Sequence, residues 1–241
     1  MFPATDNPAQ RLLDILNEAR KQPHGPISQV WEKVFNLKMD PPNFYKVCGH
    51  LNNLVDLVEI RIKQIKGLNH GLFLRDLPAI RRIVSPTSMG ENWNSIKGPL
   101  ETGALTGLEF CSNELGKLHI EIPIPNEDLK RLRAEFATLM TEISNSEIAS
   151  ELKMILSDLA ASSLLAIDQY RILGNEGLKK AVAYAIGTVT LHRDQFVGGK
   201  SESFVRRSMD SIMSLCKLVS AAYKVGELAA PELAKLLDHV N

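Results

Sequence analysis

The chain has 241 residues, of which 44% are apolar, 23% charged and 6% aromatic, and it contains three cysteines. These proportions are ordinary for a soluble globular protein, and they exclude collagen-like chains, disulfide scaffolds and highly charged disordered chains. The 28 Lys and Arg residues balance the 28 Asp and Glu residues. This balance argues against a protein that binds nucleic acid with its whole surface.

The neutral total conceals an uneven distribution of charge along the sequence. Basic and acidic residues number 13 and 9 in residues 1–100, 6 and 12 in residues 101–171, and 9 and 7 in residues 172–241. The net charges of the three segments are therefore +4, −6 and +2. Such segregation is expected where charged segments pair within the chain or between copies of it. It also arises when solvated helix faces vary by chance, so both interpretations stay open.

The first part of the chain has the spacing of three and four residues between apolar positions that is typical of amphipathic helices. Asp6 and Asn7 can each cap a helix that has Pro8 at its first position, and Asp40 precedes Pro41 in the same way. Gly67 is a natural helix stop. The pattern predicts helices over about 8–22, 26–37, 41–67 and 77–84.

A break in this pattern follows at residues 85–98. The segment reads SPTSMGENWNSIKG and is rich in turn-forming and helix-breaking residues. It predicts a loop or linker between two domains, with Trp93 anchoring the loop to a core. The predicted domains are an N-terminal helical subdomain over residues 1–84 and a C-terminal unit over residues 99–241.

The second half of the chain has a helical pattern apart from one short segment. Apolar stripes predict long helices over about 99–118, 126–144, 147–173, 176–196 and 203–224, and a short final helix from 231. Long amphipathic helices joined by short turns favour antiparallel neighbours. The predicted fold class is therefore all-α, with an antiparallel helical bundle in the C-terminal unit.

Residues 119–125, HIEIPIP, are the exception. Ile120, Ile122 and Ile124 occur at every second position, which is the period of an extended segment. Pro123 excludes a central β-strand, because proline has no N–H to donate to a neighbouring strand. The three isoleucines either lie across the helices as a crossover or form an edge that pairs with a partner or a second copy. On the second alternative they are the candidate partner-binding residues.

Sequence motifs for catalysis are incomplete. The string GGKS at 198–201 resembles the end of a phosphate-binding P-loop, but Asp194 stands where the first glycine is needed and the preceding pattern is helical. The histidines and cysteines form no ligand pair at metal-binding spacing. Cys48, Cys111 and Cys216 are expected to be reduced core residues. The sequence predicts no catalytic residue, no metal site and no cofactor, and it favours a protein that is not an enzyme.

Three pairs of adjacent basic residues are the candidates for binding nucleic acid, because basic side chains near helix ends can hold phosphate. Aromatic rings that would stack on bases are not interleaved with them, so an ordinary solvated helix surface is the simpler interpretation. The six candidate residues are Arg81, Arg82, Lys179, Lys180, Arg206 and Arg207.

The sequence gives no sign of membrane targeting. The N-terminus lacks the basic and apolar regions of a signal peptide, and the longest weakly charged stretches fall short of the roughly 20 residues that span a bilayer. The expected location is the cytoplasm, with no membrane contact in the resting state. The Ala/Leu-rich faces of residues 155–167 and 181–191 would have to emerge in a membrane-perturbing effector.

The block NPAQRLLDILNEAR at residues 7–20, followed by VWEKVFNL at residues 30–37, resembles the opening of helical proteins of unassigned function in bacteria. Some of those proteins are encoded near mobile-element and defence genes. The resemblance covers about the first 40 residues, implies no activity and carries over no functional residue.

Together these features predict a non-enzymatic helical subunit that binds a protein partner or copies of itself, as an assembly or regulatory component. The resemblance implies an accessory component of a bacterial defence system as its setting. The first alternative is a nucleic-acid-binding or RNA-cleaving effector whose site is assembled from scattered basic residues. The second alternative is a membrane-perturbing helical effector.

Overall fold

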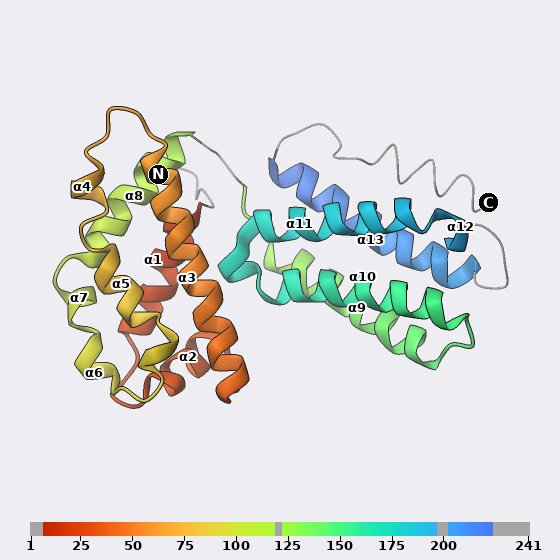
Figure 1. The fold of residues 1–241 in the computed structure, drawn as a ribbon, viewed down its shortest axis with the longest axis horizontal. Helices are drawn as coiled ribbons and strands as arrows, with labels where there is room; N and C mark the ends of the chain where they lie inside the picture. Colours follow the sequence, from red (N-terminus) through yellow and green to blue (C-terminus); the bar gives the residue numbers. More distant parts are fainter. Residues whose placement is uncertain (1–6, 119–121, 197–201, 224–241) are drawn as a thin grey trace. The chain divides into compact units, whose positions relative to one another are not determined.

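The computed structural model describes residues 7–118, 122–196 and 202–223, and most of these residues are helical (Figure 1). Within these ranges there is no β-strand, and the one β-bridge is an isolated pairing of Pro26 with Asn92. The predicted all-α fold class is therefore confirmed. None of the described helices is both long enough and apolar enough to cross a membrane.

The chain divides into two compact units, residues 1–120 and residues 121–241. This boundary differs from the one predicted at residues 85–98, which lie inside the first unit. The turn residues of that segment form two short helices, and the Trp93 side chain is fully buried. The Trp93 backbone N–H donates to the carbonyl of Gly25 at 2.8 Å. The segment is thus fastened to the first unit as a packed element, and the predicted anchoring role of Trp93 is correct.

The first unit is an assembly of helices of very different lengths. Asn7 and Asp40 cap the first and third helices as predicted, because their side chains accept the backbone N–H groups of Gln10 and Asn43. The helices are α1 (Pro8–Arg20), α2 (Ile27–Phe35), α3 (Pro41–Lys63), α4 (His70–Phe73), α5 (Leu77–Ile83), the 3₁₀ turn η1 (Pro86–Ser88), α6 (Trp93–Ile96), α7 (Gly98–Glu101) and α8 (Ala104–Leu118).

Aromatic and polar contacts join distant parts of the first unit. The indole rings of Trp31 and Trp93 meet edge to face with their centroids 6.2 Å apart, and both side chains are fully buried. The buried Asn7 side chain donates to the carbonyl of Ser112 at 3.2 Å, which links the start of α1 to α8. Because α8 packs on both α1 and α3, the first unit extends well beyond residue 84.

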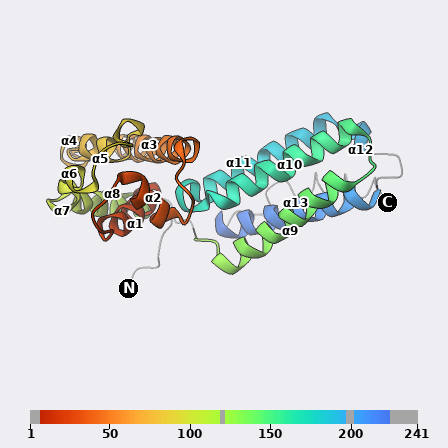
Figure 2. The ribbon, with the colours of Figure 1, turned by 90° about the horizontal axis from the view of Figure 1, so that it is seen from below.

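The second unit is a four-helix bundle, which Figure 2 shows from a second direction. Consecutive helices run antiparallel, and the last one packs against both the first and the third, so the bundle closes on itself. Leucine and other aliphatic side chains dominate the core, with Phe136 as its largest fully buried member. The helices are α9 (Asn126–Asn145), α10 (Ser150–Asp168), α11 (Tyr170–Leu191), the short α12 (Arg193–Phe196) and α13 (Glu202–Tyr223).

A backbone break at Gly174 lies near the start of α11. Its φ of 59° and ψ of −158° are not helical, and a positive φ costs glycine little because it has no Cβ. The sequence predicts Gly174 as the end of one helix and the residues after it as the start of the next. In the structure α10 already ends at Asp168, and one turn of helix precedes the break.

The predicted final helix from residue 231 lies outside the described residues, as does the string at 198–201.

Candidate functional site

The described part of the extended segment, residues 122–125, is held inside the second unit. The Ile122 N–H donates to the carbonyl of Ala222 at the end of α13 at 3.1 Å. The Ile122 carbonyl accepts the side-chain amide of Asn175 at 3.0 Å, and the Ile124 N–H donates to the Tyr170 hydroxyl at 2.9 Å. Tyr170 in turn donates to the Asn175 side-chain oxygen at 2.9 Å. The segment is therefore tied to the kinked start of α11 and to the end of α13.

The exposure of the candidate isoleucines agrees with these contacts. Ile124 is only 6% exposed and belongs to the bundle core, whereas Ile122 is 39% exposed. Ile120 lies outside the described residues. Because the backbone of residues 122 and 124 already bonds to α11 and α13, these contacts favour the crossover interpretation for this stretch over a free edge.

The first basic pair lies in the first unit and is bound to carboxylates. Arg81 on α5 donates to Asp56 and, at 2.6 Å, to Glu59, both on α3. Hydrogen bonds from Lys63 and Arg81 lower the pKa of the Glu59 carboxyl, and the bonds to the two carboxylates raise the pKa of Arg81. Arg82 lies 3.6 Å from Glu91. Both arginines thus lie within ion-pair distance of carboxylates of the first unit.

The other two basic pairs lie on different helices of the second unit. Lys179 and Lys180 are exposed on α11, and Arg206 and Arg207 are exposed on α13. Arg207 forms an ion pair of 2.7 Å with Glu142 on α9. The six candidate residues are therefore divided between the two units.

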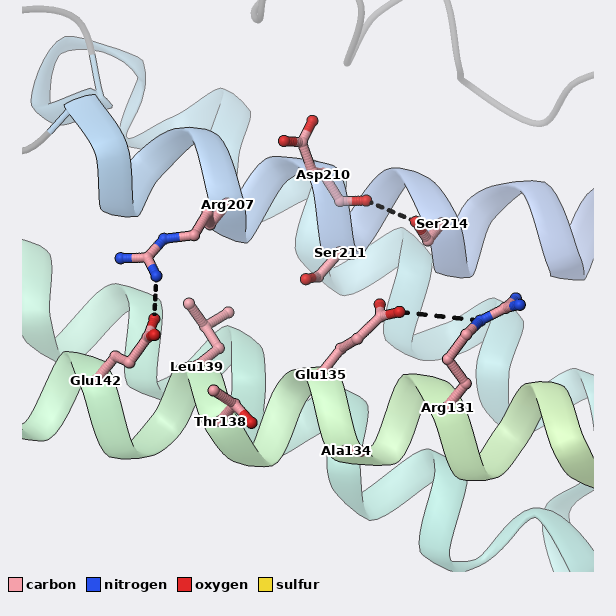
Figure 3. A pocket seen from close by; sticks show the side chains of 10 residues that line it. All are labelled: Arg131, Ala134, Glu135, Thr138, Leu139, Glu142, Arg207, Asp210, Ser211 and Ser214. Atoms are coloured by element: carbon pink, nitrogen blue, oxygen red, sulfur yellow. Dashed lines mark hydrogen bonds and ion pairs between the residues drawn. The ribbon is translucent and has the colours of Figure 1, made fainter.

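A groove of about 550 Å³ runs between α9 and α13 (Figure 3). Small side chains line much of it, and charged side chains stand along both rims. Figure 3 shows Arg207 reaching across to Glu142 at one end and Arg131 beside Glu135 at the other. The lining residues are Arg131, Ala134, Glu135, Thr138, Leu139, Glu142, Arg207, Asp210, Ser211 and Ser214.

The charges of the α9/α13 groove are largely matched within it. Arg131 lies 2.9 Å from Asp128 and 3.9 Å from Glu135. Together with the Arg207–Glu142 pair, these contacts engage both guanidinium groups with carboxylates of the same chain. A ligand would have to replace these pairs, so the groove is a weaker binding site than its volume suggests.

The three cysteine thiols are buried. Burial raises the pKa of Cys48 to about 12 and those of Cys111 and Cys216 to about 11. Such thiols are not ionised near neutral pH, so they are poor nucleophiles. Burial, and to a smaller degree the charge of Lys46, lowers the pKa of His50. In the part of the chain that the structure describes, no cluster of three or more metal-ligating side chains is found.

The outward side of α11 carries exposed apolar side chains. Here Tyr184 is 47% exposed and Leu191 is 84% exposed. Both lie on the face opposite the buried positions of the same helix, such as Leu178 and Val189. We call the five exposed residues at this spacing the α11 stripe. They are Lys180, Ala183, Tyr184, Gly187 and Leu191.

Gly187 lies at the middle of the α11 stripe, and no packing contact within the chain requires a glycine there. A Cβ added to Gly187 would meet no other atom within 4 Å. Glycine in a helix interior weakens the helix relative to alanine, and here no close packing within the chain requires it. The sequence signal for this surface is that residues 181–191 are apolar or small around the whole helix circumference. Sequence reasoning noted that stretch only in connection with membranes.

Exposed apolar side chains also occur in the first unit. Leu72 is 60% and Phe110 is 57% exposed, and the ring of Phe110 packs edge to face against that of Phe73. This cluster joins a short helix, α4, to α8. It lacks the regular helical spacing of the α11 stripe, which makes the α11 stripe the stronger candidate for a helix-to-helix contact.

Comparisons with known proteins give no relative. No family model matches the sequence, no curated protein matches it, and no solved structure matches the fold.

Proposed function

We propose that this protein is a non-enzymatic helical interaction subunit that assembles through its second unit. The observation that carries the proposal is the α11 stripe, where Tyr184 and Leu191 are exposed at helical spacing on a face opposite the core. Apolar side chains repeated along one exposed helix face are typical of surfaces that bind another helix.

The chemistry of the remaining candidate residues supports the same proposal. Arg81, Arg82 and Arg207 lie within ion-pair distance of carboxylates of the same chain, so they offer less positive charge to phosphate than the sequence suggests. The cysteine thiols are buried with raised pKa values. A role in binding proteins requires neither free basic groups nor a reactive nucleophile.

The cellular setting that we propose is the cytoplasm of a bacterium, with an accessory role in a defence system. The resemblance of residues 7–37 to bacterial helical proteins is what supports the setting.

Affinity capture from an extract of the native host tests the proposal. The bait is the tagged chain, and the matched control is the same bait with Tyr184→Asp and Leu191→Asp, which are surface changes that leave the core intact. We expect a defined set of proteins, other copies of the chain included, to be retained by the first bait and lost with the second at an unchanged melting temperature. Identical retention by both baits would contradict the proposal.

A further inference from the structure

The α11 stripe has properties that identify its partner. We propose that it binds the same stripe of a second copy of this chain, with the two α11 helices antiparallel and a two-fold axis passing beside Gly187. This inference rests on the proposed function and names the first partner of the interaction subunit. A two-fold contact uses the same patch on both copies, so the patch must be complementary to itself.

Gly187 allows the close approach that such a contact needs. In an antiparallel pair centred on this residue, the two glycines face each other at the crossing point. The space around the missing Cβ is empty within the chain, so the backbone of another helix can enter it. A small residue at a helix crossing lets the two backbones pack closely.

The flanking apolar side chains fit the same axis. Tyr184 lies three residues before Gly187 and Leu191 lies four after it, so both are displaced to the same side of the contact line on the helix surface. Under the two-fold axis Tyr184 of one copy therefore lies beside Leu191 of the partner subunit, and this apolar contact occurs twice.

The charges at the ends of the contact are complementary under the same symmetry. Lys180 lies seven residues before Gly187, and Asp194, at the start of α12, lies seven residues after it. Both side chains belong to exposed residues. Two-fold pairing therefore brings Lys180 of each copy, about 10 Å from the axis along α11, toward the end of α11 in the partner subunit, where Asp194 follows in α12. One symmetry operation thus satisfies shape and charge together.

Charge also favours a second copy over a lipid surface. Insertion of the α11 stripe into a bilayer would carry Lys180 and Asp194 toward hydrocarbon, where a carboxylate without a partner is strongly disfavoured. In the two-fold pair each of these groups approaches an opposite charge instead.

Cysteine cross-linking tests the pairing directly in the full-length chain. Gly187→Cys places a thiol at the axis, Lys180→Cys places one about 20 Å from its symmetry mate, and Thr141→Cys on the exposed side of α9 measures random collision. A disulfide needs Cα atoms within about 7 Å of each other. The three native cysteines are buried, so their background reaction is low. We expect mild oxidation to yield a covalent dimer from Gly187→Cys only.

Other cross-linking patterns overturn the proposal. Equal cross-linking at positions 187 and 180 indicates a parallel pair, and equal cross-linking at 187 and 141 indicates collision without a specific contact. No cross-linking at 187 in a variant with an unchanged circular dichroism spectrum also overturns it.

The mass of the protein in solution, measured by light scattering, gives a second test that does not depend on oxidation. We expect a dimer for the unaltered chain and a monomer for Gly187→Leu, whose side chain occupies the space of the second helix. The matched control is Gly49→Ala in α3, where an added Cβ also meets no atom within 4 Å, and it should remain a dimer. Lys180→Glu and Asp194→Lys should each weaken the dimer at least tenfold, and the double variant should restore it.

The results separate this inference from the proposed function. A monomer that still captures a different protein through Tyr184 and Leu191 overturns the two-fold pairing and leaves the interaction subunit standing. A chain that is monomeric and also captures nothing overturns both. A monomer that binds vesicles of anionic lipid through the α11 stripe overturns the pairing in favour of a membrane contact.

Discussion

The two units fix their irregular segments by different means. In the first unit residues 85–98 are held by the burial of one large aromatic side chain, Trp93, against Trp31. In the second unit residues 122–125 are held by a hydrogen-bond network with a fully buried amide, Asn175, at its centre. The difference shows that an irregular segment can be held by burial of an apolar side chain or by hydrogen bonds to a buried polar side chain. Mutations should therefore destabilise the two segments by different amounts.

Removal of the aromatic anchor has the largest expected effect. Trp93→Ala leaves a cavity beside Trp31 and should destabilise the first unit by about 3–5 kcal/mol. Labelling of cysteines under native conditions, followed by mass spectrometry, reports which unit opens. We expect Cys48 and Cys111 to react much faster than in the unaltered chain and Cys216 to remain protected. Trp93→Phe, which retains part of the apolar volume, should have a smaller effect. Simultaneous exposure of all three thiols would show that the units unfold together and would break the comparison.

Removal of the polar anchor has a moderate effect. Asn175→Leu removes the amide donor to the Ile122 carbonyl and the acceptor of the Tyr170 O–H, at a cost of about 2–3 kcal/mol. The free energy of unfolding from urea denaturation gives the measurement. Tyr170→Phe is the companion variant: it removes the acceptor of the Ile124 N–H and the donor to Asn175, so it should cost a similar amount. If Asn175→Leu is neutral, the network does not fasten the segment and the distinction between the units is lost.

The ion pairs of the two units give the smallest expected effect. Arg81→Gln removes contacts to Asp56 and Glu59, and because these side chains are partly exposed the loss should be about 0.5–1 kcal/mol. Arg133→Gln is the control in the second unit, since its pair with Asp168 is more exposed, and it should cost less. Thermal melting of both variants against the unaltered chain measures the difference.

The cost of Arg81→Gln should also depend on pH. The pKa of Glu59 in the folded state lies below the ordinary value of 4.5. A carboxyl with a lowered pKa stabilises the fold above its unfolded pKa, and this contribution is lost as the pH falls through its folded pKa. The difference between the unaltered chain and the variant should therefore shrink on acidification below 4.5. A difference that grows instead would exclude Glu59 as the source.

Local signals in the sequence account for much of the fold. The caps at Asn7 and Asp40 are determined by residues within a few positions, so the starts of the helices they cap could be predicted. The break at Gly174 could be predicted too, but not the end of α10 at Asp168. The domain boundary could not, because turn-forming residues such as those at 85–98 build short packed helices as readily as linkers. The burial of Trp93 and the hydrogen bond from its N–H to Gly25 distinguish these cases.

The candidate sites depend on contacts that sequence spacing does not reveal. Arg81 meets Asp56 across 25 positions of the chain, and Asn175 meets Ile122 across 53. A basic residue therefore looks available in the sequence when a distant carboxylate already binds it. The α11 stripe was partly visible as an apolar stretch, but its direction relative to the core required the positions of the neighbouring helices.

The closing contact of the second unit also constrains the order in which the protein can fold during synthesis. The described elements of the first unit end at residue 118, so all of them are synthesised before the bundle begins. By contrast α9, the first helix of the bundle, packs against α13, the last, and Ile122 bonds to Ala222. A nascent chain can therefore cover α9 with α10 early, but it lacks the contact of α9 with α13 until nearly 80 further residues have been made. At translation rates of about 5–20 residues per second this interval lasts several seconds, and it is the stage at which a chaperone would be needed.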